Sequence, residues 1–113
     1  MSNVRRLVKT REIVKLALDP AGGLLVYPSM DGRPSYEYIY REANGLRWNH
    51  EKQALHAHEP LRWKPEELLS HIAITLRSCC DEALSFTEKT EWQGVSPELR
   101  TRLLHALAHN QNS

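Results

Sequence analysis

The dipeptide Asn44-Gly45 is the strongest local folding signal in the sequence, because both residues tolerate the positive φ angles of a type I′ hairpin turn. Strand-forming residues flank it on both sides, over residues 36–43 and 46–49. A two-residue loop would place Ala43 opposite Leu46 and so fix the register of the whole pair. The sequence therefore predicts an antiparallel hairpin at the centre of the fold.

The predicted register gives this hairpin an apolar face and a polar face that is rich in tyrosine. The apolar face, which we expect to pack on the core, comprises Ile39, Arg41, Ala43, Leu46 and Trp48. On this face the Arg41 guanidinium can lie over the Trp48 ring. The polar face comprises Tyr36, Tyr38, Tyr40, Glu42, Arg47 and Asn49.

A third strand is expected over residues 54–58. If the loop before it has four residues, Trp48 pairs with Leu55, and His56 and His58 join the tyrosine-rich face. An odd loop length would move both histidines to the opposite face, because side chains alternate along a strand. The face on which the two histidines lie therefore stays open at this point.

The N-terminal third of the chain predicts a second hairpin. Residues 3–18 fit either a helix or a strand, and the alternation of apolar residues over 12–18 favours a strand. The run Asp19-Pro20-Ala21-Gly22-Gly23 interrupts the chain strongly, and an apolar segment follows at residues 24–27. We expect residues 12–18 to pair with residues 24–27.

The C-terminal half predicts two helices. Pro65 suits the first position of a helix over residues 65–80, whose apolar stripe would include Cys79 and leave Ile74 outside it. Ser96 is a good N-cap for a second helix. Between the helices, residues 83–87 suggest an edge strand and Trp92 is expected in a loop.

Composition excludes several classes of protein. With 113 residues, 41% hydrophobic and 26% charged, the chain has the composition of an ordinary globular protein. The net charge of +1 gives no bulk electrostatic reason to bind nucleic acid or an anionic membrane. The adjacent Cys79 and Cys80 are expected to be reduced thiols, since neighbours in sequence do not easily satisfy disulfide geometry. With no secretory signal or membrane span evident, we expect a cytoplasmic protein.

Seven residues of the tyrosine-rich face and the third strand form the best candidate site: Tyr38, Tyr40, Glu42, Arg47, Asn49, His56 and His58. Tyrosine and arginine favour a protein interface, although antiparallel sheets also commonly expose one plain polar face. A small-molecule site is the third interpretation, with His56 as general base and Tyr40 and Arg47 orienting an anionic substrate. His56 and His58 lack a fixed third ligand, so no metal or cofactor is predicted.

The run Tyr36–Trp48, continued by Glu59-Pro60, Trp63 and the helical segment Glu66–Leu76, resembles small proteins encoded by bacterial integron gene cassettes. The resemblance covers roughly residues 23–107. It implies a bacterial cytoplasmic protein carried by a mobile genetic element, often an α+β oligomer, of unknown function. It supplies no site residues.

Together these patterns predict an α+β fold, with a mostly antiparallel sheet of four or five strands and two helices packed on one face. We expect a single domain over residues 1–113, with flexible ends at 1–10 and 109–113. The leading functional hypothesis is a non-enzymatic interaction module that forms a homodimer through the tyrosine-rich face or a sheet edge. A small-ligand binder or hydrolase using the same face is the alternative, so enzymatic activity stays an open question.

Overall fold

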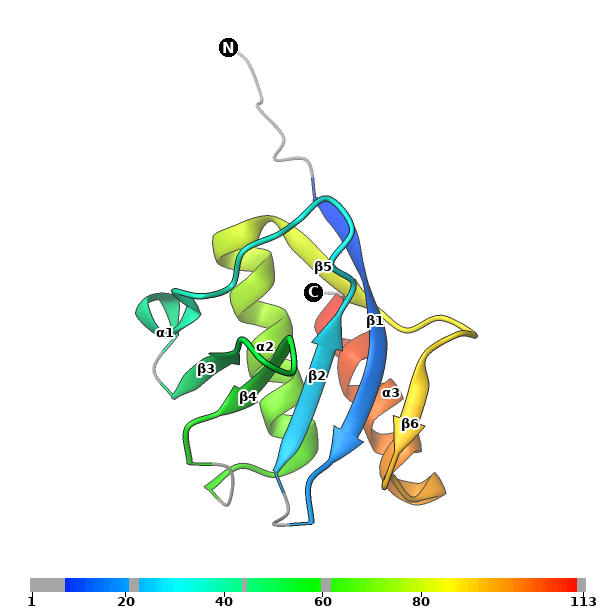
Figure 1. Ribbon diagram of the computed structural model, residues 1–113. Helices are drawn as coiled ribbons and strands as arrows, with labels where there is room; N and C mark the ends of the chain where they lie inside the picture. The colour runs from blue at the N-terminus through cyan, green and yellow to red at the C-terminus, as the bar shows by residue number, and fades with distance from the viewer. Residues whose placement is uncertain (1–7, 21–22, 44, 60–61, 112–113) are drawn as a thin grey trace.

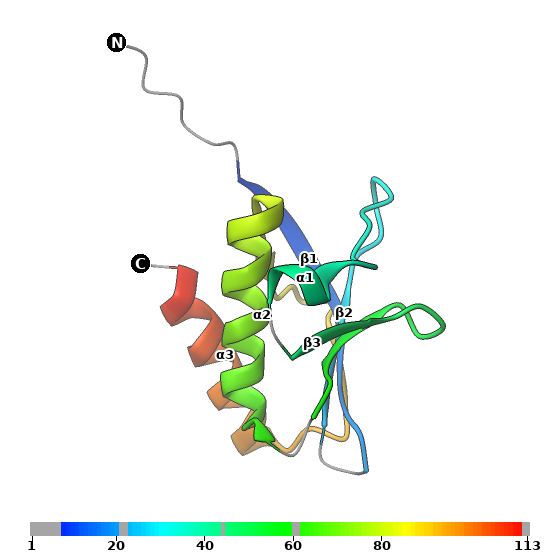
Figure 2. The same ribbon diagram turned by 90° about the vertical axis from the view of Figure 1, so that its left-hand side faces the viewer.

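The computed structural model describes residues 8–20, 23–43, 45–59 and 62–111, without the side chains of residues 110 and 111. The strands are β1 (Lys9–Leu18), β2 (Leu24–Pro28), β3 (Leu46–Asn49), β4 (Ala54–Ala57), β5 (Glu82–Ser85) and β6 (Glu91–Gln93). The helices are α1 (Ile39–Glu42), α2 (Pro65–Cys80) and α3 (Pro97–Gln111). The strands form one sheet, and α2 and α3 lie on the same side of it (Figures 1 and 2).

The predicted α+β class is confirmed, and the sheet is mixed. Its strand order is β3-β4-β2-β1-β5, and β6 pairs with β1 beside β5. The β1–β2, β2–β4 and β3–β4 pairs are antiparallel, whereas β5 and β6 run parallel to β1. The parallel pairs arise because α2 carries the chain across the sheet before β5, and a crossover of this kind delivers a parallel strand.

The N-terminal hairpin lies where the sequence predicts it. β1 and β2 are antiparallel, with Leu18 opposite Leu24, and the amide of Asp19 donates a hydrogen bond to the Gly23 carbonyl. The strand alternative is therefore correct for residues 9–18, whereas residues 1–7, with the basic Arg5 and Arg6, lie outside the described residues. β1 is long because its first half pairs with β5 and its second half with β6.

The prediction for the central hairpin is confirmed for β3 and the strand after it, and it is wrong for the segment before β3. β3 and β4 pair in the predicted register: Leu46 with Ala57, Arg47 with His56, Trp48 with Leu55 and Asn49 with Ala54. Residues 36–43 are not the strand that was predicted beside β3. They form a turn followed by the single-turn helix α1, in which the Ala43 amide bonds to the Ile39 carbonyl. Of the predicted turn, Asn44 lies outside the described residues, and Gly45 has a φ of +91°.

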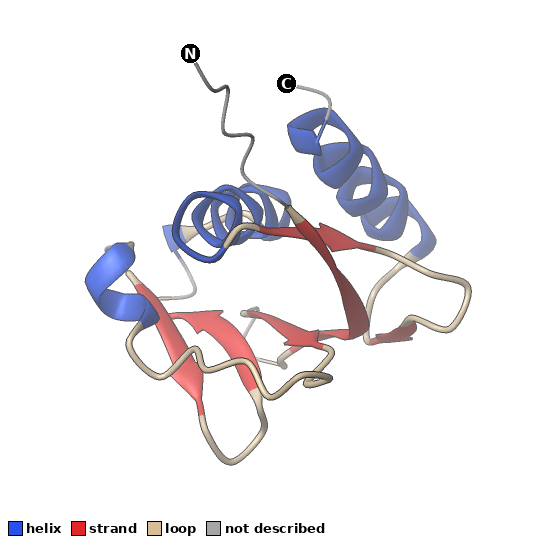
Figure 3. Ribbon diagram, turned by 90° about the horizontal axis from the view of Figure 1, so that it is seen from above, coloured by secondary structure: helices blue, strands red, loops and turns tan. Residues whose placement is uncertain are grey.

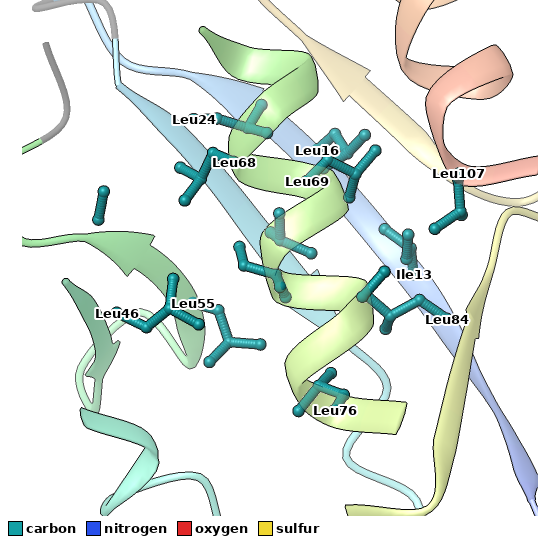
Figure 4. Packing of buried hydrophobic residues seen from close by; sticks show 14 of the residues in the cluster. Ile13, Leu16, Leu24, Leu46, Leu55, Leu68, Leu69, Leu76, Leu84 and Leu107 are labelled. Carbon is teal, nitrogen blue, oxygen red and sulfur yellow. The ribbon is translucent and has the colours of Figure 1, made fainter. Parts of the chain in front are cut away.

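The helix α2 has the predicted bounds and supplies the centre of the core. Pro65 is its first residue, and the Glu67 carboxylate accepts a hydrogen bond from the Lys64 amide, which would otherwise lack a helical partner. Its buried residues pack on the inner side chains of the sheet (Figure 4). They are Leu68, Leu69, Ile72, Ala73, Thr75 and Leu76.

The expectation that Cys79 is buried in this stripe is wrong, since its side chain is exposed. At this end of α2 the neighbour is the short α1 segment instead of a strand, and Cys79 lines small clefts there. Ile74, which was left outside the stripe, is 55% exposed. None of the helices in the described part of the chain combines the length and apolar composition that crossing a membrane requires.

The chain after α2 forms the second edge of the sheet and the last helix. Most of the predicted edge strand is present as β5. Trp92 was expected in a loop but lies in β6 opposite Leu16, because its ring completes the core beside Phe86. The Ser96 hydroxyl accepts a hydrogen bond from the Leu99 amide, so the predicted N-cap is confirmed. α3 continues to Gln111 and packs beside α2 (Figure 3).

The packing of α2 predicts a contrast between two residues of similar size on the same helix. Leu69→Ala should lower the free energy of unfolding by about 2–5 kcal/mol, because Leu69 is fully buried and the change leaves a cavity. Ile74→Ala should cost less than about 1 kcal/mol, since Ile74 is mostly solvated. Urea denaturation followed by circular dichroism measures both values, and equal losses would contradict this orientation of α2.

Candidate functional site

The structure divides the seven predicted site residues between a helix and two strands. Tyr38, Tyr40 and Glu42 belong to α1 and its N-cap, Arg47 and Asn49 to β3, and His56 and His58 to β4 and the residue that follows it. The predicted pairing of Arg47 with His56 is present. The tyrosines are not on the same strand face, so the site is not the flat surface that the sequence predicted.

Four residues of α1 and β3 form an exposed surface that we call the tyrosine–arginine patch: Tyr38, Tyr40, Arg41 and Arg47. Tyr38 is 56% exposed and Tyr40 is 44% exposed. The Arg41 Cζ lies 4.5 Å from the centre of the Tyr38 ring and 5.8 Å from that of Tyr40. The Arg47 Cζ lies 5.5 Å from the Tyr40 ring, so both cations are held over aromatic faces.

The predicted contact of Arg41 with Trp48 is wrong, because α1 turns Arg41 away from the core. Trp48 instead packs against Tyr36, with 5.3 Å between the ring centres. Within the described part of the chain, no carboxylate pairs with Arg41 or Arg47. Both guanidinium groups are therefore available to a binding partner.

A buried hydrogen-bond network supports the patch from below. The Tyr36 hydroxyl donates to Oε1 of Glu82 at 2.6 Å, and both side chains are almost fully buried. Oε2 of Glu82 accepts from Nη2 and Nε of Arg11, at 2.6 and 3.1 Å. Burial, followed by the bond to Glu82, raises the pKa of Tyr36 well above its ordinary value, so the phenol remains a donor. The Tyr36 carbonyl then accepts from the Ile39 amide at the start of α1.

Beside the patch lies a cleft of about 430 Å³, which we call the Arg47 cleft. Its lining residues are Gly45, Arg47, His58, Glu59, Arg62, Trp63 and Glu67. The Arg62 Nε lies 3.0 Å from the Glu59 Oε2. Arg47, by contrast, donates to the carbonyl of Leu46 and has no carboxylate partner among the described residues.

Arg62 and Trp63 were missed as site residues. The sequence places them before a helix, where Trp63 has the spacing of a hydrophobic staple with Leu68. Only the tertiary fold brings them beside Gly45 and Arg47, some sixteen residues earlier in the chain. A Cβ atom at Gly45 would lie 3.8 Å from the Trp63 ring, which shows how closely these segments approach.

The other predicted residues lie outside the cleft. The Asn49 Oδ1 accepts a hydrogen bond from the Lys52 amide and so closes the turn between β3 and β4. His56 is half-buried, with Nδ1 3.1 Å from the Ala57 carbonyl oxygen. Glu42 lines two small clefts together with Cys79, at the end of α2. Among the described residues, no three His, Cys, Asp or Glu side chains come close enough to hold a metal ion.

Comparison with known proteins gives one informative match. No family model matches the chain, and no curated protein matches it. Among solved structures, it is similar to the integron cassette protein Hfx_Cass5, from the mobile metagenome of the North West Arm Sewage Outfall. The two are 32% identical, over 89% of this chain and 98% of that chain, with a TM-score of 0.40.

The chain belongs to the same family as this integron cassette protein. Membership rests on the sequence identity over nearly the full length of Hfx_Cass5, and the TM-score adds nothing to it. The resemblance noted in the sequence is thereby confirmed. Membership assigns no ligand or reaction, so the function of this cassette protein has to be argued from its own surface.

The network beneath the patch predicts a difference between two tyrosines. Tyr36→Phe should lower the free energy of unfolding by about 1–3 kcal/mol, because it leaves a buried carboxylate oxygen of Glu82 without its donor. Tyr40→Phe is the matched control, since its ring is exposed, and it should change stability by less than about 0.5 kcal/mol. Urea denaturation measures both, and a neutral Tyr36→Phe would contradict the role given to this hydroxyl.

Proposed function

We propose that this cassette protein is a non-enzymatic interaction module whose tyrosine–arginine patch binds a second copy of the chain. The observation that carries the proposal is the exposure of Tyr38 and Tyr40 next to two arginines that lack carboxylate partners among the described residues. Tyrosine and arginine are the residue types that contribute most to binding at protein interfaces. When a partner binds, exposed aromatic rings also bury a large area and lose little side-chain entropy.

Charge supports a second copy as the occupant. The segment that carries Arg41 also carries Glu37 and Glu42, both exposed. In a two-fold symmetric dimer each surface meets its own copy, so a surface that presents both signs can pair its arginines with the glutamates of its partner. A surface that carried the two arginines without the neighbouring glutamates would instead repel its copy.

The support under α1 makes the patch suited to binding. Tyr36 fixes the start of α1 to Glu82, and Ile39 and Ala43 are buried. A surface that is already ordered loses less conformational entropy when a partner binds. The neighbouring β3 lies at one end of the sheet order, so its edge can extend the same interface.

The proposal includes that this is a bacterial protein encoded by a mobile genetic element and that it is located in the cytoplasm. Its support is the adjacent pair of free cysteines, which a reducing compartment maintains as thiols. The near-neutral net charge favours a protein partner over nucleic acid.

A second candidate function is the binding of a small anion in the Arg47 cleft. Its volume of about 430 Å³ is within the range of ligand pockets, and Trp63 offers an apolar wall beside Arg47 and His58. His58 thus replaces His56 as the histidine that could contact a ligand. This function ranks second because Glu59 and Glu67 share the lining and oppose an anion.

Self-association should depend on the two tyrosines of the patch. In sedimentation velocity over a range of concentrations, we expect a dimer that the Tyr38→Ala/Tyr40→Ala variant weakens by about tenfold or more, since interface tyrosines often contribute over 1 kcal/mol each. Leu104→Ala is the control, because Leu104 is 40% exposed on α3, away from the patch. A wild-type protein that stays monomeric at its highest soluble concentration would refute the dimer.

A charge exchange tests whether the copies meet through the same surface. Arg41→Glu alone and Glu37→Arg/Glu42→Arg alone should each lose self-association, because each makes the segment carry one sign. Mixing the two variants should restore a dimer, which native mass spectrometry identifies as the mixed species. Failure to form the mixed dimer, with both variants folded, would contradict the symmetric arrangement.

The cleft makes a separate prediction with inorganic phosphate and succinate as probes. If the cleft binds anions, these probes should raise the melting temperature of the wild type, and Arg47→Ala or His58→Ala should abolish the rise. His56→Ala is the matched control, since His56 pairs with Arg47 across the strands but is not among the cleft's lining residues. An unchanged rise in Arg47→Ala would exclude the cleft as the site.

A further inference from the structure

The last two residues of α2, Cys79 and Cys80, form a dithiol at the surface. Their Sγ atoms lie 3.1 Å apart and share one S–H···S hydrogen bond. Cys79 is exposed, whereas Cys80 is partly buried. Adjacent residues on a helix do not normally face each other, so both side chains must turn toward one another to make this contact.

A small cleft is lined by both cysteines. Its volume is about 170 Å³, and its lining comes from the segment around α1 and from the end of α2. The lining residues are Ser35, Tyr36, Tyr38, Ile39, Glu42, Cys79 and Cys80. If the two sulfurs bind one atom, the cleft therefore has room for a substituent on that atom.

We propose that Cys79 and Cys80 together bind trivalent arsenic compounds, with the third substituent of the arsenic in the cleft beside α1. The site shares Tyr38 with the interface proposed above, but its two thiol ligands are not part of that interface. An organic arsenoxide, R–As=O, reacts with the two thiols to give R–As(S-Cys79)(S-Cys80) and one water. Two As–S bonds form, the As=O bond is lost, and both thiol protons leave in the water. Arsenic remains trivalent, so no oxidant or reductant is needed.

The distance between the two sulfurs favours trivalent arsenic over a zinc ion. A tetrahedral ion with bonds of about 2.3 Å needs sulfurs roughly 3.8 Å apart, whereas bonds of the same length at nearly a right angle bring them to about 3.3 Å. The observed separation of 3.1 Å lies nearer the second value. Zinc also requires further protein ligands, and no group of three ligating side chains is present among the described residues. Pyramidal trivalent arsenic needs only the two sulfurs and its own substituent.

The protonation of Cys80 adds selectivity. Burial, followed by the hydrogen bond between the two thiols, raises the pKa of Cys80 to about 12. The nearby carboxylates of Glu82 and Glu42 act in the same direction. Because the thiolate is the form that attacks alkylating agents and disulfides, Cys80 should react slowly with them at neutral pH. Condensation with an arsenoxide consumes neutral thiols overall and releases their protons in water, so a raised thiol pKa does not weaken the adduct.

The cleft lining indicates which arsenicals fit best. Tyr38 is the exposed aromatic residue of the lining, whereas Tyr36 and Ile39 are almost fully buried. An aryl or alkyl substituent on arsenic would therefore contact apolar surface, whereas the hydroxyl of inorganic arsenite would gain less. We expect phenylarsine oxide to bind more tightly than arsenite.

Phenylarsine oxide is the probe for the test, added to freshly reduced full-length protein in excess glutathione. Intact-mass spectrometry should show one phenylarsenic group per chain with two hydrogens lost. Excess glutathione should not remove it, whereas 2,3-dimercaptopropanol should, because only a second dithiol matches the effective concentration of the pair. The adduct should form at about a hundredfold lower concentration than in Cys79→Ser or Cys80→Ser.

Two results would overturn the proposal. One is an adduct on either single-cysteine variant that resists glutathione as well as the wild-type adduct does. The other is a wild-type adduct that glutathione alone removes, a measurement that needs no variant and so does not depend on how a substitution folds. Tyr38→Ala, which shortens one wall of the cleft, should weaken phenylarsine oxide binding while leaving arsenite binding unchanged.

Discussion

The buried carboxylate of Glu82 is the interaction on which the rest of the structure depends. A buried charge is costly unless it is paired and its remaining lone pairs are satisfied. Here Arg11 of β1 supplies the cation and Tyr36 supplies the second donor. Arg11 also donates from Nη1 to the carbonyls of Ser29 and Asp31. One carboxylate therefore joins β1, β5, the loop after β2 and the segment that leads into α1.

This network explains why the tyrosine-rich segment is not a strand. Pairing beside β3 would place Tyr36 on a solvated face and would remove the donor from Glu82. The turn at residues 36–38 keeps the phenol in the core, and α1 then projects Tyr38 and Tyr40 outward. The same turn creates both surfaces that we propose to be functional. Tyr38 belongs to both surfaces, because it carries Arg41 in the tyrosine–arginine patch and lines the cleft beside Cys79 and Cys80.

Local signals predicted much of the fold because they act within a few residues. Pro65 and the apolar repeat of α2 set its bounds, and Ser96 set the start of α3. The β3–β4 register followed from the alternation of side chains and a four-residue loop. The errors share a different cause. Trp92 and Cys79 were misplaced because their burial depends on β1 and α1, which are distant in sequence.

By itself, the sequence determined the α+β class, the pairing of residues 12–18 with residues 24–27, the register of β3 and β4, and the family to which the chain belongs. These follow from periodicity, capping and turn chemistry, which involve neighbouring residues. Only the tertiary structure decided that β5 and β6 run parallel to β1, that Arg62 and Trp63 join Arg47 in a cleft, and that Tyr36 is buried. The physical reason is that pairing a buried charge across 71 residues outweighs the strand preference of one short segment.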